Sequence, residues 1–176
     1  MHYLMKSGIL SVSESEKKLA QIKSILCGAK KVISLHDSGT QYTMDIDIAE
    51  APLGKRDDVR YRVYNLRNET NEVLMEARPG YDENDNPDVA GWPVFRVPKV
   101  DHADLMIGDS PYVLIMQNSQ NYILKDESGD SVLQIIHKGI AGGWEIETTE
   151  TFNPQILCGI FIFCRYIERE NEFYIV

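Results

Sequence analysis

Basic side chains are scarce in this sequence of 176 residues: 18 Lys and Arg stand against 27 Asp and Glu, which gives a formal net charge of −9 at pH 7. A nucleic-acid-binding protein needs a basic surface to neutralise phosphates, and a polybasic membrane anchor needs one as well. The charge therefore excludes nucleic acid as the expected partner. It leaves a protein as the predicted partner and disfavours phospholipid as the alternative.

Cysteine is also scarce, because only Cys27, Cys158 and Cys164 are present. Their odd number and irregular spacing argue against a disulfide framework or a zinc finger, so we expect a reducing, cytoplasmic environment. The first residues lack the apolar run of a signal peptide, and no stretch reaches the roughly 20 apolar residues of a transmembrane helix. The length suits one hydrophobic core, so residues 1–176 are predicted to form a single domain.

Most of the sequence has the pattern of short β-strands. Residues 42–48 and 144–148 alternate between apolar and polar side chains, as half-buried strands do. Residues 37–39 and 126–129 end in Gly after turn-forming residues, which predicts hairpins. With weaker runs added, the pattern predicts about twelve strands, spaced as in an all-β barrel or sandwich.

A third hairpin is predicted between residues 59–66 and 72–78. A three-residue loop at 67–69 would align the apolar positions of the two strands and set Arg60 opposite Glu76. Such a cross-strand charge pair is favourable, so this register is the expected one.

Residues 13–26 interrupt the β pattern. Ser13 and Glu16 have the spacing of a capping box, and apolar residues follow at helical intervals. The segment predicts a short amphipathic helix near the N-terminus.

A second helix is predicted near the C-terminus, where residues 153–154 (Asn-Pro) suit a helix start. Residues 156–164 are apolar on every side, and Arg165 and Glu168 close the run. Such a helix must be enclosed by protein or lipid, and the run is about half the length that spans a membrane. We therefore expect about 14 helical residues buried inside a β-barrel, followed by a short strand at 172–176.

This order of elements resembles the tubby C-terminal-like superfamily, which includes LURP-one-related and phospholipid-scramblase-like proteins, and in particular its small bacterial members. The residues that carry the resemblance are the hairpin at 126–129, the strand at 142–147 and the helix at 156–167. The resemblance implies a closed barrel of twelve strands around a central helix. Members of the superfamily act in phosphoinositide-dependent membrane tethering, lipid scrambling or plant defence and share no chemistry, so the resemblance implies one of several possible roles.

One acidic segment has the beginning of a calcium-binding pattern. Asp82, Asn84, Asn86 and Asp88 lie two residues apart, as do the first ligands of an EF-hand loop. Pro87 stands where that loop needs Gly. The segment is either a calcium site, in line with a calcium-responsive scramblase-like activity, or a solvated loop rich in turn-forming residues.

Two further groups are candidate binding residues. Asp101 and His102 form a neighbouring acid and base, which an enzyme would use for proton transfer. Trp92 and Phe95 form either an exposed aromatic platform or an anchor that holds a long loop to the barrel. Both groups are candidates for surface binding.

A barrel filled by its own helix has no central pocket for a substrate, which leaves the loops and the outer surface for binding. The sequence therefore predicts a non-enzymatic intracellular binding or regulatory protein, with no cofactor and no catalytic residue. The alternatives are a membrane-associated, scramblase-like protein and an enzyme built around Asp101 and His102.

Overall fold

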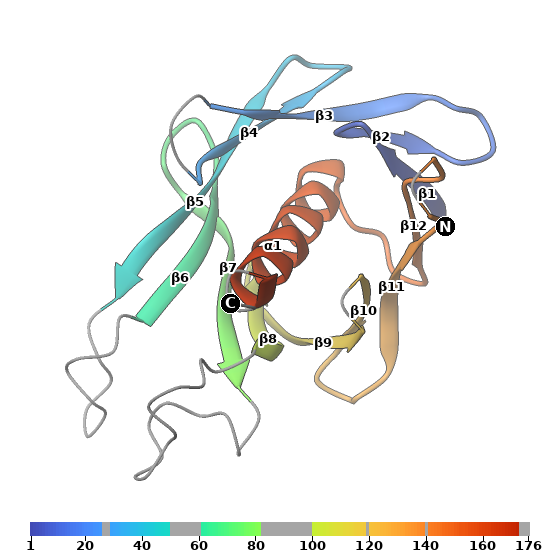
Figure 1. Cartoon of the computed structure of the whole chain (residues 1–176). Helices are drawn as coiled ribbons and strands as arrows, with labels where there is room; N and C mark the ends of the chain where they lie inside the picture. The colour runs from blue at the N-terminus through green and yellow to red at the C-terminus, as the bar shows by residue number, and fades with distance from the viewer. Residues whose placement is uncertain (26–28, 50–60, 82–99, 119, 140, 173–176) are drawn as a thin grey trace, which may run out of the picture.

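The computed structural model describes residues 1–25, 29–49, 61–81, 100–118, 120–139 and 141–172. In these residues the chain forms twelve β-strands followed by one α-helix (Figure 1). The strands are β1 (His2–Lys6), β2 (Ile9–Val12), β3 (Lys18–Ser24), β4 (Lys31–Leu35), β5 (Gln41–Ala49), β6 (Tyr61–Arg67), β7 (Val73–Tyr81), β8 (Val100–Ile107), β9 (Ser110–Asn118), β10 (Asn121–Lys125), β11 (Ser131–His137) and β12 (Trp144–Thr148), and the helix is α1 (Pro154–Glu172).

The strands form one closed antiparallel barrel. Each strand pairs with its neighbours in the sequence, and β1 also pairs with β12 to close the sheet. Because successive side chains of a strand point to opposite faces, Met44 and Ile146 point inward and are fully buried, whereas Ile48 near the end of β5 is 66% exposed. The predicted barrel is confirmed. Because the sheet closes, each of the twelve described strands pairs on both of its sides.

Helix α1 lies inside the barrel, with the strands arranged around it (Figure 1). It packs against β3 to β8. A Cβ atom on Gly159 would lie only 3.1 Å from Leu66 Cδ2 and 3.2 Å from Met75 Cε, so the missing side chain lets α1 approach the wall. The predicted buried apolar helix is confirmed by its least exposed residues, which are Leu157, Cys158, Ile160, Phe163 and Cys164.

The helix is longer than the sequence predicts. It has 19 residues, about 28 Å at 1.5 Å per residue. It continues past Arg165 and Glu168 because these two side chains pair with each other, and the hydroxyl of Tyr122 donates to the buried Glu168 carboxylate at 3.3 Å. Glu172 ends the helix instead of starting a strand, and residues 173–176 lie outside the described part of the chain. Among the described residues, no helix is both long enough and apolar enough to cross a bilayer.

The predicted N-terminal helix over residues 13–26 is wrong. Residues 18–24 form β3, and no helix is present between residues 13 and 25. Residues 13–17 instead turn the chain from β2 to β3: the backbone NH of Glu16 donates to the carbonyl of Val12, and Glu16 has a φ of 55°. β3 fills the place between β2 and β4, whose backbone groups would otherwise lack partners, so tertiary pairing overrides the local helical spacing.

The hairpin of β6 and β7 is present, but its predicted register is wrong. Glu76 lies opposite Asn65, and Arg60, its predicted partner, lies outside the described residues. The turn is longer than predicted because the side-chain oxygen of Asn68 accepts a hydrogen bond from the backbone NH of Glu72 at 2.9 Å. This side-chain bond stabilises a wider loop, which shifts the alignment of the two strands.

Candidate functional site

Six of the predicted site residues lie outside the described part of the chain and stay predictions: Asp82, Asn84, Asn86, Asp88, Trp92 and Phe95. The remaining two, Asp101 and His102, lie near the start of β8. The structure therefore tests only the candidate acid and base.

Asp101 and His102 contact each other through Oδ1 and Nδ1. Their side chains are 49% and 40% exposed, and the imidazole ring lies over Gly80 on the neighbouring strand β7. Within the described residues, no further acid, base or nucleophile hydrogen-bonds to the pair. General acid–base catalysis needs a pair positioned in a concave site, and neither hollow described below is lined by Asp101 or His102.

The thiols of Cys158 and Cys164 offer no nucleophile either. Both are free and buried in α1, as predicted. Burial raises the pKa of Cys158 to about 12 and raises that of Cys164 as well. Both thiols therefore stay protonated and act as small hydrophobic groups in the core.

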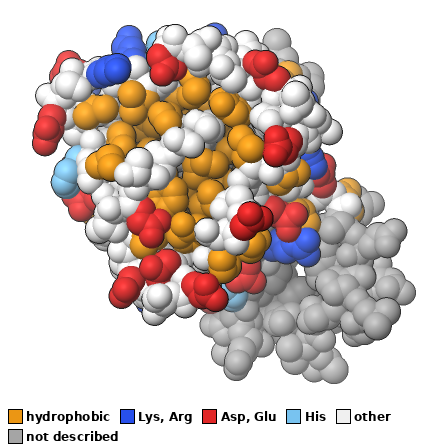
Figure 2. Space-filling model, turned by 180° about the vertical axis from the view of Figure 1, so that it is seen from behind, with side chains coloured by type: hydrophobic (Ala, Val, Ile, Leu, Met, Phe, Trp, Pro, Cys, Tyr) orange, Lys and Arg blue, Asp and Glu red, His pale blue; other side chains and the backbone are white. Residues whose placement is uncertain are grey.

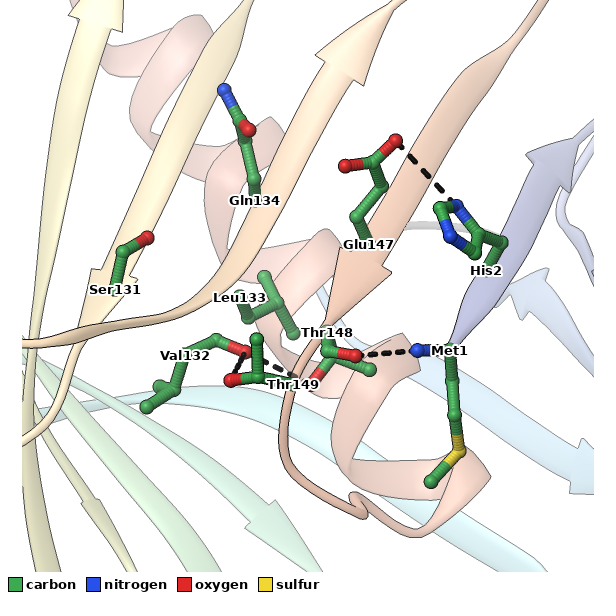
Figure 3. Close-up of a pocket in the computed structure, with 9 residues that line it drawn as sticks. All are labelled: Met1, His2, Ser131, Val132, Leu133, Gln134, Glu147, Thr148 and Thr149. Carbon is green, nitrogen blue, oxygen red and sulfur yellow. Dashed lines mark hydrogen bonds and ion pairs between the residues drawn. The ribbon is translucent and has the colours of Figure 1, made fainter.

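The outer wall carries a hollow of about 490 Å³ where β11, β12 and β1 meet (Figure 3). Two of its hydroxyl groups bond within the protein: the Thr148 and Thr149 hydroxyls donate to the Val132 carbonyl at 2.9 Å and 3.4 Å. The side chains of His2, Glu147 and Gln134 lie on its outer part (Figure 3). Its lining consists of Met1, His2, Ser131, Val132, Leu133, Gln134, Glu147, Thr148 and Thr149.

A group of metal-ligating side chains lies on this wall. His2 of β1 is directly opposite Glu147 of β12, and its Nδ1 lies 3.5 Å from Glu147 Oε1. Glu145, two residues earlier, points to the same face, and one ligand atom from each of the three residues lies within 4.8 Å of the others. Lys138 Nζ contacts Glu145 Oε2 at 2.5 Å, and this hydrogen bond raises the pKa of Lys138.

The end of the barrel at which α1 begins is strongly acidic. Six segments connect the elements there: residues 13–17, 36–40, 68–72, 108–109, 126–130 and 149–153. They hold 10 of the 27 acidic side chains of the chain but only one of its 18 lysines and arginines, Lys17. The acidic residues are Glu14, Glu16, Asp37, Glu69, Glu72, Asp109, Asp126, Glu127, Asp130 and Glu150. We call these ten residues the acidic ring. Acidic side chains are more frequent in these six segments than in the chain as a whole.

Within this acidic ring, the inward-facing positions at the strand ends are apolar. These residues are half-buried and pack against the core. Seen from behind, the molecule shows hydrophobic side chains gathered in the middle of a face and acidic side chains around them (Figure 2). At the edge of this area a hollow of about 290 Å³ lies between the β2–β3 turn and the first residues of α1. We call the ten acidic residues and the following apolar residues the helix-start face: Val12, Leu35, Tyr42, Ile107 and Tyr112.

Tyr112 ties this face to the start of α1. Its ring contacts Phe152 edge to face, with 5.9 Å between ring centroids, and its hydroxyl donates to Glu150 Oε2 at 3.2 Å. Burial and the neighbouring Glu150 carboxylate raise the pKa of Tyr112. Tyr112 on β9 thus joins the apolar centre to the segment that precedes α1 through two direct contacts.

Sequence reasoning missed both surfaces. His2 is separated from Glu145 by almost the whole chain, and no local spacing links them. The ten acidic residues are spread over six turns, and only the up-and-down order of the strands brings them to one end. Comparisons with known proteins add no further information about the site: no protein-family model, no curated protein and no solved structure matches this chain.

Proposed function

We propose that this protein is a non-enzymatic binding domain whose partner is another protein, and that it binds this partner through the helix-start face. The single observation that carries the proposal is the partly exposed apolar area surrounded by ten carboxylates. A contiguous apolar area with a polar rim is typical of an interaction surface. The partner segment would combine apolar side chains with lysines or arginines, since such a segment complements both the centre and the rim.

A membrane surface fits this face less well. Anionic headgroups would meet an acidic ring that contains one lysine, so the electrostatic term opposes binding. A positively charged amphipathic polypeptide gains from the same ring. Membrane association is therefore the alternative that the experiment below distinguishes from protein binding.

An enzymatic function has less support than binding. The exposed Asp101 and His102 pair lies on β8, and the thiols of α1 are buried and protonated. The interior, where an enclosed substrate pocket would lie, is occupied by α1. Binding of a protein partner is supported by the helix-start face, which combines an apolar area with a high density of negative charge.

We also propose that the chain belongs to the tubby C-terminal-like superfamily and acts in the cytoplasm. The support is the closed barrel of twelve strands around a C-terminal helix, which is the arrangement that the resemblance implies. Fold alone does not assign function, so the binding proposal depends on the helix-start face and not on this membership.

The proposal is tested with a synthetic amphipathic peptide of leucine and lysine, measured by fluorescence anisotropy against the full chain. Leu35→Lys places a positive charge in the apolar centre, and we expect it to weaken binding by about five- to tenfold. Val113→Lys is the matched control, because Val113 is 37% exposed on β9 but lies outside the face. It adds the same charge and should change the affinity by less than about twofold.

A peptide of leucine and glutamate should not bind, and raising the salt concentration should weaken binding of the lysine peptide. Equal weakening by both lysine variants would contradict the proposal, because it would mean that only net charge matters. Stronger binding to phosphatidylserine-containing vesicles than to the lysine peptide at physiological salt would favour the membrane alternative instead.

A further inference from the structure

The first and last strands of the barrel carry three metal-ligating side chains on their shared outer face. His2 and Glu147 lie directly opposite each other across the β1–β12 pair, and Glu145 lies one pleat further along β12. The residue between the two glutamates, Ile146, points inward and is fully buried. Both carboxylates are therefore held outward by the burial of their neighbour.

The distances suit a small divalent ion after modest side-chain rotation. In a tetrahedral zinc site with bonds of roughly 2.0–2.1 Å, two ligand atoms lie about 3.3 Å apart. His2 Nδ1 and Glu147 Oε1 are already 3.5 Å apart, and all three ligand atoms lie within 4.8 Å of one another. One imidazole and two carboxylates form a donor set that zinc and similar transition ions accept, and water would complete the coordination.

Two neighbouring side chains bear on this group. Gln134 of β11 lies opposite Glu147 on its other side, where it lines the same hollow (Figure 3). Lys138 contacts Glu145 and holds this carboxylate by its positive charge. An ion at this position would compete with Lys138 for Glu145, so the lysine opposes binding.

We propose that His2, Glu145 and Glu147 bind a divalent transition-metal ion of the zinc class on the outer wall of the barrel. The ion links β1 to β12, the pair that closes the barrel. Because it binds the folded chain and not separated strands, it stabilises the closed barrel. This site does not depend on the protein-binding proposal for the helix-start face.

The test is isothermal titration of the untagged full chain with ZnCl₂, together with thermal unfolding. We expect one ion per chain, and a melting temperature about 5–10 °C higher at a zinc concentration of roughly 100 times Kd. His2→Ala and Glu147→Gln should each weaken binding by at least about tenfold, since even the loss of a group that only orients a ligand has an effect of that size. His36 is an exposed histidine in the turn between β4 and β5, so His36→Ala should leave the zinc affinity unchanged.

Lys138→Met separates a built site from general attraction to carboxylates. Removing a positive charge that contacts Glu145 should raise the affinity about five- to tenfold at low salt. The Co²⁺ complex should show ligand-field bands without thiolate charge transfer, because the ligands are nitrogen and oxygen. The proposal is overturned if the chain binds no zinc, if His2→Ala and Glu147→Gln both bind as tightly as the native chain, or if thiolate bands appear.

Discussion

Replacing Phe163 by alanine tests whether α1 supports the barrel from within. The Phe163 side chain is 0% exposed, and its ring meets that of Tyr64 edge to face at 4.9 Å between centroids. Phe163→Ala leaves a cavity between α1 and the wall and removes this ring contact. Buried Phe→Ala substitutions lower the free energy of unfolding by about 3–5 kcal/mol. For a domain of this size, that loss corresponds to a melting temperature lower by about 6–20 °C.

Urea unfolding followed by circular dichroism measures the free energy, and thermal unfolding gives the melting temperature. Val113→Ala is the control, because Val113 is exposed on the outer wall and should change the stability by no more than about 0.5 kcal/mol. If Phe163→Ala and Val113→Ala have equally small effects, the helix is not enclosed by the sheet. The reasoning from the apolar run to the filled barrel would then be refuted.

Three further outcomes are expected. Gly159→Leu should lower the free energy of unfolding by about 1–3 kcal/mol in urea titrations, because its side chain would enter space that the barrel wall already fills. Tyr122→Phe should cost about 1–2 kcal/mol in the same assay, because the hydroxyl donates to the buried Glu168. Tyr112→Phe should reduce the loss of stability as the pH rises above 10.0. The raised pKa of Tyr112 means that the folded chain holds the phenol proton more tightly, so this stabilisation is complete below pH 10.0 and is lost as the pH rises through the raised value. An unchanged pH profile would contradict that reading.

Strands and the buried helix were predictable where local pattern and burial agree. The alternation in residues 42–48 and 144–148 has the period of the sheet, so Met44 and Ile146, which contribute to the strand pattern, also fill the core. The run at 156–164 is apolar on all sides, which only an enclosed helix satisfies in a chain of this kind.

Prediction failed where the deciding partner is distant in the sequence. Residues 18–24 have helical spacing, but β2 and β4 need a strand between them to satisfy their backbone groups. The register of β6 and β7 depends on a turn in which the side-chain oxygen of Asn68 accepts hydrogen bonds from the backbone NH groups of Thr70 and Glu72, and apolar alignment does not reveal this turn. In both cases a pairing interaction outweighs the local preference.

The sequence by itself determined the fold class, the buried helix and the excess of negative charge, because these follow from periodicity, hydropathy and composition. Only the tertiary structure decided where that charge lies. The up-and-down order of the strands brings six separate turns to one end, and the closing pair of β1 and β12 places His2 beside Glu145 and Glu147. Surface sites arise from side chains that meet in space, and their meeting depends on strand order and register rather than on any local pattern.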